Sequence, residues 1–241
     1  MIRNPDESIL AILELRQDGV PEKFLGTGFV VAPLGVFVTA RHVFTDRPAD
    51  SKNVVVVAII DAHDNTCRDF RPINNVRLSS TTDLAIAELQ SLEGLRLLSL
   101  NRGQAPTNVD VLTSDHSLTD ITTDEQGKRV VRFFPGTLKG NIVRHYVSDY
   151  PKTRGMRCFD TSFPALRGAS GAPVMVQPRF DVVGMLVGNV GRHLLPAQVL
   201  KGYDNSGSVI EEVRYYLPFG QALEADEVIE ALEALGVPNH P

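Results

Sequence analysis

A series of short apolar runs limits what this chain can fold into. The runs are rich in Val, Ile, Leu and Phe, and each is bounded by Gly, Pro, Asp or Asn, which interrupt regular structure. They lie at residues 9–15, 24–32, 36–40, 54–60, 84–89, 130–134, 172–176 and 182–187. Many short strands spaced in this way predict an all-β fold, either a sandwich or a pair of β-barrels.

One helix is expected near the end of the chain, over residues 222–235. Its apolar residues recur at helical spacing, acidic residues occupy its first turn, and Gly236 with Pro238 ends it. The most polar part of the chain is the segment 102–129. We expect its beginning to connect two β halves and the rest to form exposed loops.

Composition excludes several classes of protein. The 241 residues are 43% hydrophobic and 22% charged, which is typical of a globular chain rather than a disordered one. A net charge of −5 argues against nucleic-acid binding, because that affinity comes mostly from clustered Lys and Arg. No apolar run is long enough to span a bilayer, and the first residues lack the basic-then-apolar order of a secretion signal. We therefore expect a cytoplasmic protein with no membrane association.

The two cysteines, Cys67 and Cys158, lie far apart in the sequence. A secreted protein held together by disulfides carries more cysteines at shorter spacings, so both are predicted to be free thiols. Neither has a neighbouring Cys or His at the spacing of metal ligands, which argues against a structural zinc site.

Two segments place a histidine and an aspartate beside apolar runs. In the first, Gly26-Thr-Gly28 and the run 36–40 precede His42, so that a strand and a short turn can hold the imidazole rigidly. In the second, Asp83 immediately precedes the run 84–89, where its carboxylate can orient a histidine through the ring N–H and stabilise the imidazolium. Taken alone, each residue is better explained as one that caps a turn.

The third segment reads Arg167-Gly168-Ala-Ser170-Gly171-Ala-Pro173. Its glycines permit backbone conformations closed to other residues, so consecutive N–H groups can point at one spot beside the Ser170 hydroxyl. Taken alone, it could also be a Gly/Ser turn between strands. The nucleophile elbow of α/β-hydrolases is argued against, because that elbow leads into a helix and its triad runs Ser, Asp, His. Here an apolar strand follows Ser170, and the best histidine lies upstream.

Together the three segments resemble the chymotrypsin/trypsin-like serine peptidases. The matches, in the order His, Asp, Ser, are Thr39-Ala40-x-His42, Asp83-Leu-Ala and Gly168-x-Ser170-Gly171-x-Pro173. The resemblance extends from residue 9 to residue 235. It implies one peptidase domain over residues 1–241, made of two antiparallel β-barrels with a C-terminal α-helix at residues 222–235. The barrel at residues 9–95 would carry His42 and Asp83, and the barrel at residues 110–216 would carry Ser170.

The resemblance also implies the roles of the catalytic residues. Ser170 would be the nucleophile, His42 the general base, and Asp83 the residue that orients His42. The backbone N–H groups of Gly168 and Ser170 would form the oxyanion hole. The substrate would be a protein or peptide, and no metal or organic cofactor is required.

Five further positions are implied to bind substrate. The substrate backbone would pair with the chain around Val187, Gly188 and Asn189, adding a strand to the sheet edge. Pro164 would lie near the base of the primary pocket, where cleavage after Lys or Arg needs an acid that proline does not supply. An apolar or small side chain is therefore expected there. Arg167, at the rim, could favour acidic residues nearby or could be a solvated surface charge.

Two positions depart from the family pattern. Ala172 stands where the family usually has glycine, which adds only a methyl group and leaves Ser170 and Gly171 untouched. Ala169 stands where zymogen-type members have an aspartate that pairs with a newly released N-terminus. Activation by that ion pair is therefore not expected.

Two interpretations of a different kind stay open beside the enzyme. The chain could be a catalytically idle peptidase fold that serves as a binding or scaffold module, although such a module has no need of all three triad residues. A regulatory protein partner could also control the enzyme, because a cytoplasmic peptidase must avoid digesting its host. Trypsin-like peptidases of bacterial defence are controlled in this way, and the resemblance alone suggests that role.

Overall fold

The structure is a computed structural model that describes residues 5–48, 51–60, 67–91, 93–193, 200–203, 206, 209–213 and 216–237. Its first six strands close into an antiparallel barrel in the order β1-β2-β3-β6-β5-β4. The strands are β1 (Ile9–Leu15), β2 (Pro21–Ala32), β3 (Val36–Ala40), β4 (Val54–Ile60), β5 (Cys67–Leu78) and β6 (Leu84–Leu89). The short helices η1 (Pro5–Ser8), η2 (Pro33–Gly35) and α1 (His42–Thr45) lie between or before them.

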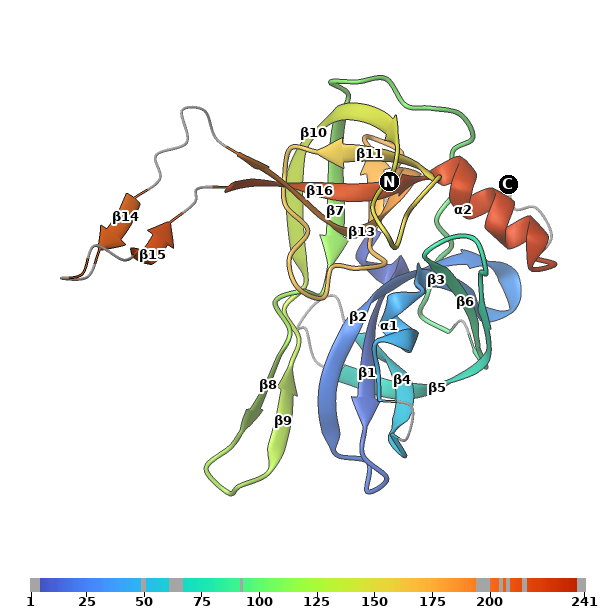
Figure 1. Ribbon diagram of the computed structural model, residues 1–241. Helices are drawn as coiled ribbons and strands as arrows, with labels where there is room; N and C mark the ends of the chain where they lie inside the picture. The colour runs from blue at the N-terminus through green and yellow to red at the C-terminus, as the bar shows by residue number, and fades with distance from the viewer. Residues whose placement is uncertain are drawn as a thin grey trace.

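A second closed barrel follows, with strand order β10-β11-β16-β13-β12-β7. Its strands are β7 (Asp110–Asp115), β10 (Gly136–Val147), β11 (Arg157–Thr161), β12 (Pro173–Val176), β13 (Asp181–His193) and β16 (Tyr216–Glu224). Two hairpins stand outside the barrels, β8 (Asp120–Thr123) with β9 (Arg129–Arg132), and β14 (Leu200–Tyr203) with β15 (Val209–Val213). The expectation of an all-β, two-barrel fold with a C-terminal helix is confirmed (Figure 1).

Several boundaries differ from the expected ones. The polar segment 102–129 was expected to form a connection followed by exposed loops, but it contains two strands. Residues 111–115 of β7 are all buried. The strand β8 is exposed at both of its ends and half-buried between them. The last strand of the second barrel continues to Glu224 rather than ending at residue 216. Residues 222–224 therefore belong to β16, where Ala222 and Leu223 pair with both β11 and β13. The helix α2 (Ala225–Ala234) is shorter than the predicted 222–235 because this pairing holds its first residues in extended backbone.

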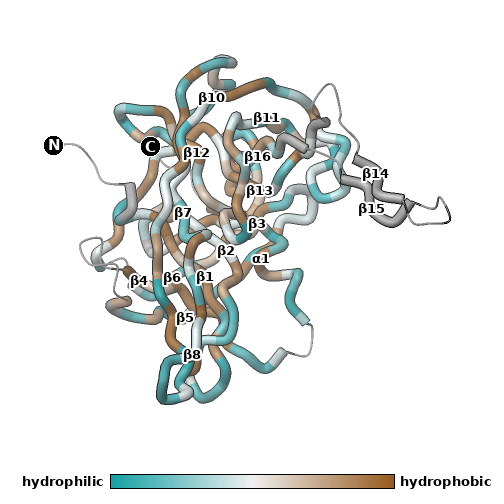
Figure 2. The backbone as a smooth tube through the Cα atoms, turned by 90° about the vertical axis from the view of Figure 1, so that its left-hand side faces the viewer, coloured by the Kyte–Doolittle hydropathy of each residue, from teal (hydrophilic) through white to brown (hydrophobic). Residues whose placement is uncertain are grey.

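The strand β1 is buried along its whole length because it has apolar neighbours on both faces. Successive side chains of a strand point to opposite faces. Leu10 and Ile12 belong to the main hydrophobic core, which continues from the first barrel into the second. Ala11, Leu13 and Leu15 face a separate cluster. Hydrophobic residues follow the barrel strands in Figure 2, whereas the connecting segments are largely hydrophilic.

The β8–β9 hairpin belongs to the second half of the chain but packs against the first barrel. Phe133, which follows β9, is 4% exposed and lies in the cluster with Leu13 and Val56. Arg129 on β9 donates hydrogen bonds to the carboxylate and the backbone oxygen of Glu22 on β2, both at 2.9 Å. The hairpin extends alongside the first barrel in Figure 1. It therefore joins the two halves next to the cleft between them.

The helix α2 packs on β13 and β16 and also touches β6 of the first barrel. Its buried residues are Ala225, Val228, Ile229, Ala231 and Leu232, which is the single apolar face expected of a surface helix. Within the described ranges, no helix is long and apolar enough to cross a membrane.

The adjacent residues Phe133 and Phe134 provide a test of the hairpin contact. Phe133 is buried, whereas Phe134 is 47% exposed. Phe133→Ala is expected to lower the free energy of unfolding by about 3–5 kcal/mol, the usual cost of removing a buried phenyl group. Phe134→Ala is expected to change it by less than about 0.5 kcal/mol. Urea denaturation measures both, and equal losses in the two variants would show that the hairpin does not pack as described.

Candidate active site

A histidine and an aspartate meet at the end of β3. This strand pairs with β6 so that Ala40 lies opposite Leu84, which brings His42, the first residue of α1, beside Asp83. The His42 Nδ1 atom lies 2.7 Å from Asp83 Oδ2, and the His42 backbone N–H donates to Asp83 Oδ1 at 3.1 Å. Asp83 is only 5% exposed. A buried carboxylate at this distance accepts the Nδ1–H of the ring, which leaves Nε2 free to take a proton.

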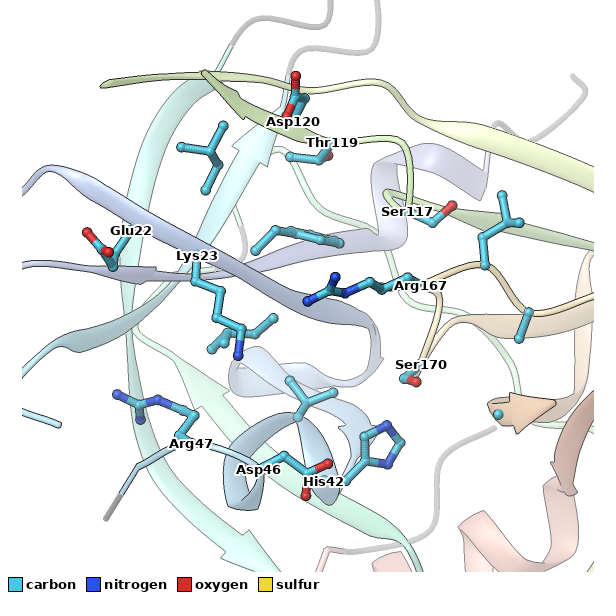
Figure 3. A pocket seen from close by; sticks show the side chains of 18 of the residues that line it. Glu22, Lys23, His42, Asp46, Arg47, Ser117, Thr119, Asp120, Arg167 and Ser170 are labelled. Atoms are coloured by element: carbon cyan, nitrogen blue, oxygen red, sulfur yellow. The ribbon is translucent and has the colours of Figure 1, made fainter. Parts of the chain in front are cut away.

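Ser170 lies on the segment that connects β11 to β12 and faces the same cleft as His42 (Figure 3). Gly171 N donates to Leu186 O at 2.7 Å, which ties this segment to β13. A Cβ atom at Gly26 would lie 3.1 Å from Ser170 O, so glycine there lets the first barrel approach the serine. Between these described residues, no hydrogen bond joins the Ser170 hydroxyl to the His42 ring, a contact that often tightens only when substrate binds.

The backbone before Ser170 forms a type II β-turn. Ala169 N donates to Leu166 O at 2.9 Å, and Gly168, the third residue of the turn, has φ +95°, a conformation that favours glycine. A Cβ at Gly168 would also lie 2.3 Å from Phe24 Cε1. Within the described part of the chain, the N–H groups of Gly168 and Ser170 donate no hydrogen bond. Both are therefore free to bind a developing oxyanion.

Thr27 of β2 connects this turn to the first barrel, a role that the sequence analysis missed. Its N–H donates to Ser170 O at 3.0 Å, and its hydroxyl donates to Gly168 O at 2.9 Å. The Thr39 hydroxyl donates to Thr27 O at 2.6 Å, and the His116 N–H donates to the Thr27 hydroxyl at 3.4 Å. Thr27 is completely buried. The Gly-Thr-Gly sequence at 26–28 was the available signal, because glycines beside a buried hydroxyl indicate a close approach of two chain segments.

The cleft has a volume of about 740 Å³. It is lined by β2 residues 22–25, by the start of the β8–β9 hairpin, by α1 and by residues 165–168 with Ser170. Of the residues expected to bind substrate, Arg167, Gly188 and Asn189 line it, whereas Pro164 and Val187 do not. Val187 is 6% exposed and falls at a register shift between β13 and β16.

The side chain of Asn189 makes two hydrogen bonds with the backbone of Ala165. Its Oδ1 accepts the Ala165 N–H at 2.7 Å, and its Nδ2 donates to Ala165 O at 2.6 Å. The amide therefore links β13 to the segment that carries Ser170. The resemblance implied that Asn189 binds the substrate backbone but did not indicate this link, because the partner is a backbone group distant in sequence.

An ion pair lies near His42. Lys152 donates to Asp46 Oδ2 at 2.8 Å across the two barrels, and this hydrogen bond lowers the pKa of the Asp46 carboxyl from its usual value. A second hollow of about 310 Å³ lies on the other side of His42, between residues 80–83 and residues 151–156.

Neither cysteine takes part in the site. Cys67 and Cys158 are free thiols, as the sequence predicted. Burial raises the pKa of Cys158 to about 12, so its thiol is not ionised at neutral pH. In the described ranges, no group of His, Cys, Asp and Glu side chains is placed to hold a metal ion.

Comparisons with known proteins extend these observations. The family described as trypsin-like peptidase domain matches residues 26–185. The structure of Rv3671c protease from M. tuberculosis in its active form is 19% identical, with a TM-score of 0.56 over 98% of this chain and 84% of that one. An inactive serine-to-alanine mutant of Rv3671c has the same identity and TM-score over 98% and 90%. At this identity, both structures show a shared fold. No curated protein matches the chain.

Labelling with a fluorophosphonate, which reacts with activated serine hydroxyls, tests the arrangement of the site. We expect Ser170→Ala to abolish labelling. Thr27→Val keeps the shape of the side chain but removes its hydrogen bond to Gly168 O, so the labelling rate is expected to fall about tenfold, the effect of roughly one hydrogen bond. Thr27→Ser keeps the hydroxyl and is the matched control, expected to stay within about twofold. Equal rates for the valine variant and the unmodified protein would contradict the role given to Thr27.

Proposed function

We propose that this chain, which belongs to the trypsin-like peptidase family and is a serine peptidase by class, is an endopeptidase that works through Ser170, His42 and Asp83. The observation that supports this proposal most directly is the hydrogen-bonded pair of His42 and Asp83, at 2.7 Å, in one cleft with Ser170. Beside the serine, the backbone N–H groups of Gly168 and Ser170 have no hydrogen-bond partner among the described residues. A nucleophile, a base with its orienting acid, and oxyanion donors are the parts needed for acyl transfer.

In the proposed reaction, Ser170 Oγ attacks the carbonyl carbon of the scissile bond while His42 Nε2 accepts the hydroxyl proton. The negative charge on the carbonyl oxygen is stabilised by the N–H groups of Gly168 and Ser170, worth about 3–4 kcal/mol per donor in related enzymes. His42 then gives its proton to the leaving amine, and the acyl group remains on Ser170. Water, deprotonated by His42, hydrolyses this ester and restores the serine.

The substrate is proposed to bind as an extended strand along β13. Gly188 and Asn189 line the cleft beside Ser170, and main-chain pairing at a sheet edge is a common way to bind a peptide. The hydrogen bonds between Asn189 and Ala165 hold two walls of this part of the cleft together. Among the described residues that line this part of the cleft, 165–168, 188 and 189, there is no acid, so an apolar or small side chain is expected on the acyl side of the cleaved bond.

The cellular setting is also a proposal. The composition supports a cytoplasmic enzyme, and such an enzyme needs narrow specificity or a regulatory protein partner. A role in bacterial defence rests only on the resemblance to peptidases of that kind. A catalytically idle binding module is the alternative, and the intact arrangement of Ser170, His42 and Asp83 argues against it.

Removing the nucleophile tests the proposed activity. Ser170→Ala is expected to lower turnover of a cleaved peptide by roughly 10⁵- to 10⁶-fold, with nearly unchanged thermal stability. His42→Ala is expected to be about as damaging, and Asp83→Asn equally or somewhat less so, because that change removes only orientation and charge stabilisation. Peptide hydrolysis by purified variants provides the measurement. Wild-type hydrolysis by Ser170→Ala would exclude the assigned nucleophile.

A second test concerns what holds the turn at residues 166–169 in place. Ala169 is fully buried and has no charge to pair with an N-terminus, whereas Thr27 holds the turn from the first barrel. A short tag added before Met1 is therefore expected to leave activity within about threefold, equivalent to roughly 0.65 kcal/mol. Tagged, untagged and trimmed proteins are compared on one peptide. Activity found only after trimming would contradict this expectation, and low activity in all three that rises with cell lysate would indicate a partner.

A further inference from the structure

The part of the cleft that lies beyond Ser170 contains a cation, Arg167, that has no partner among the described residues. The acyl segment of a substrate is proposed to lie along Gly188 and Asn189. The leaving segment must then run past Ser170 toward β2 and the β8–β9 hairpin, which form the rest of the same cleft. Figure 3 shows Arg167 extending from its loop into this region, toward Lys23.

The acids of this region are mostly engaged by other cations. Glu22 accepts a hydrogen bond from Arg129 at 2.9 Å, and Asp46 accepts one from Lys152 at 2.8 Å. Asp120 lies apart from Arg167, at the β8 end of the cleft (Figure 3).

The two arginines of this region differ in whether an acid binds them. Arg47 is held by Glu14, which accepts its hydrogen bond at 2.9 Å. Arg167, by contrast, forms no hydrogen bond or ion pair with any residue in the described part of the chain. Its guanidinium therefore retains all of its donors, in a planar arrangement that matches a carboxylate.

Arg167 is also held at a defined place relative to the reacting bond. It is the second residue of the type II turn and directly precedes Gly168, whose N–H is proposed to bind the oxyanion. The turn is fixed by the hydrogen bond from Ala169 to Leu166 and by that from Thr27 to Gly168. An extended peptide advances about 3.3 Å per residue, so an arginine next to the oxyanion hole can reach only the first residues after the cleaved bond.

We infer that Arg167 selects substrates with Asp or Glu at the first or second position after the scissile bond. This inference rests on the proposed peptidase function and adds the chemistry of the substrate: an acidic segment on the leaving side, bound by the free guanidinium. Lys23 adds a second positive charge near the same segment. The chain as a whole carries a net charge of −5, so the positive charges of Arg167 and Lys23 are a local feature of the cleft and do not follow from overall charge.

Cleavage of a proteome-derived peptide library tests the inference. The sites cut by the unmodified protein are compared with those cut by Arg167→Gln, Arg167→Glu and the Ser170→Ala control. For each variant separately, the readout is the enrichment of acidic residues at the two positions after each cut. We expect about tenfold enrichment for the unmodified protein, loss of it in Arg167→Gln, and preference for Lys or Arg in Arg167→Glu. Raised salt should reduce the enrichment, because the cleft is open to solvent.

The matched control is Arg179→Glu, since Arg179 is a cation 80% exposed at its side chain and outside the cleft. It should leave the enrichment unchanged. Ser170-dependent cleavage with no acidic enrichment, or with enrichment that persists in both Arg167 variants, would overturn this inference and leave the proposed function intact. An absence of Ser170-dependent cleavage would overturn the proposed function and this inference with it.

Discussion

The contact between the two barrels at Thr27 is the interaction on which the rest of the site depends. His42 and Asp83 come from one barrel and Ser170 from the other, so their distances are set by how the barrels meet. The Thr27 backbone and hydroxyl bind Ser170 O and Gly168 O directly. Glycine at position 26 removes the side chain that would otherwise hold the serine away. One residue of β2 thereby positions both Ser170 and Gly168.

The sequence was most informative where function requires particular residues close together in the chain. The Gly-x-Ser-Gly turn, the histidine after β3 and the aspartate before β6 were singled out because together, in this order, they resemble the motifs of a known peptidase family. Apolar strands such as β1, β3, β4 and β6 were also found, with bounds that agree with the structure. β1 and β3 are buried along their whole length and β6 almost so, and their sequences contain almost no polar interruption.

The features that the sequence did not reveal are those fixed by distant partners. The strand β7 contains Thr113, Ser114 and Asp115, and a buried strand with this composition does not stand out as apolar. Its burial follows from pairing with β10 and β12. The amide of Asn189 likewise acquires its role only because Ala165 lies opposite it. The end of the second barrel was misplaced for the same reason, since β16 is held by two partner strands rather than by its own pattern.

The position of β16 has a consequence for when the site can exist. This strand is the last of the second barrel, and it pairs with both β11 and β13, between which the Ser170 segment runs. A chain still emerging from the ribosome has made His42, Asp83 and Ser170 long before it has made residues 216–224. Until those residues arrive, the second barrel is open and the segment that carries Ser170 lacks a fixed frame. The arrangement of Ser170 beside His42 therefore forms only after β16 has been made.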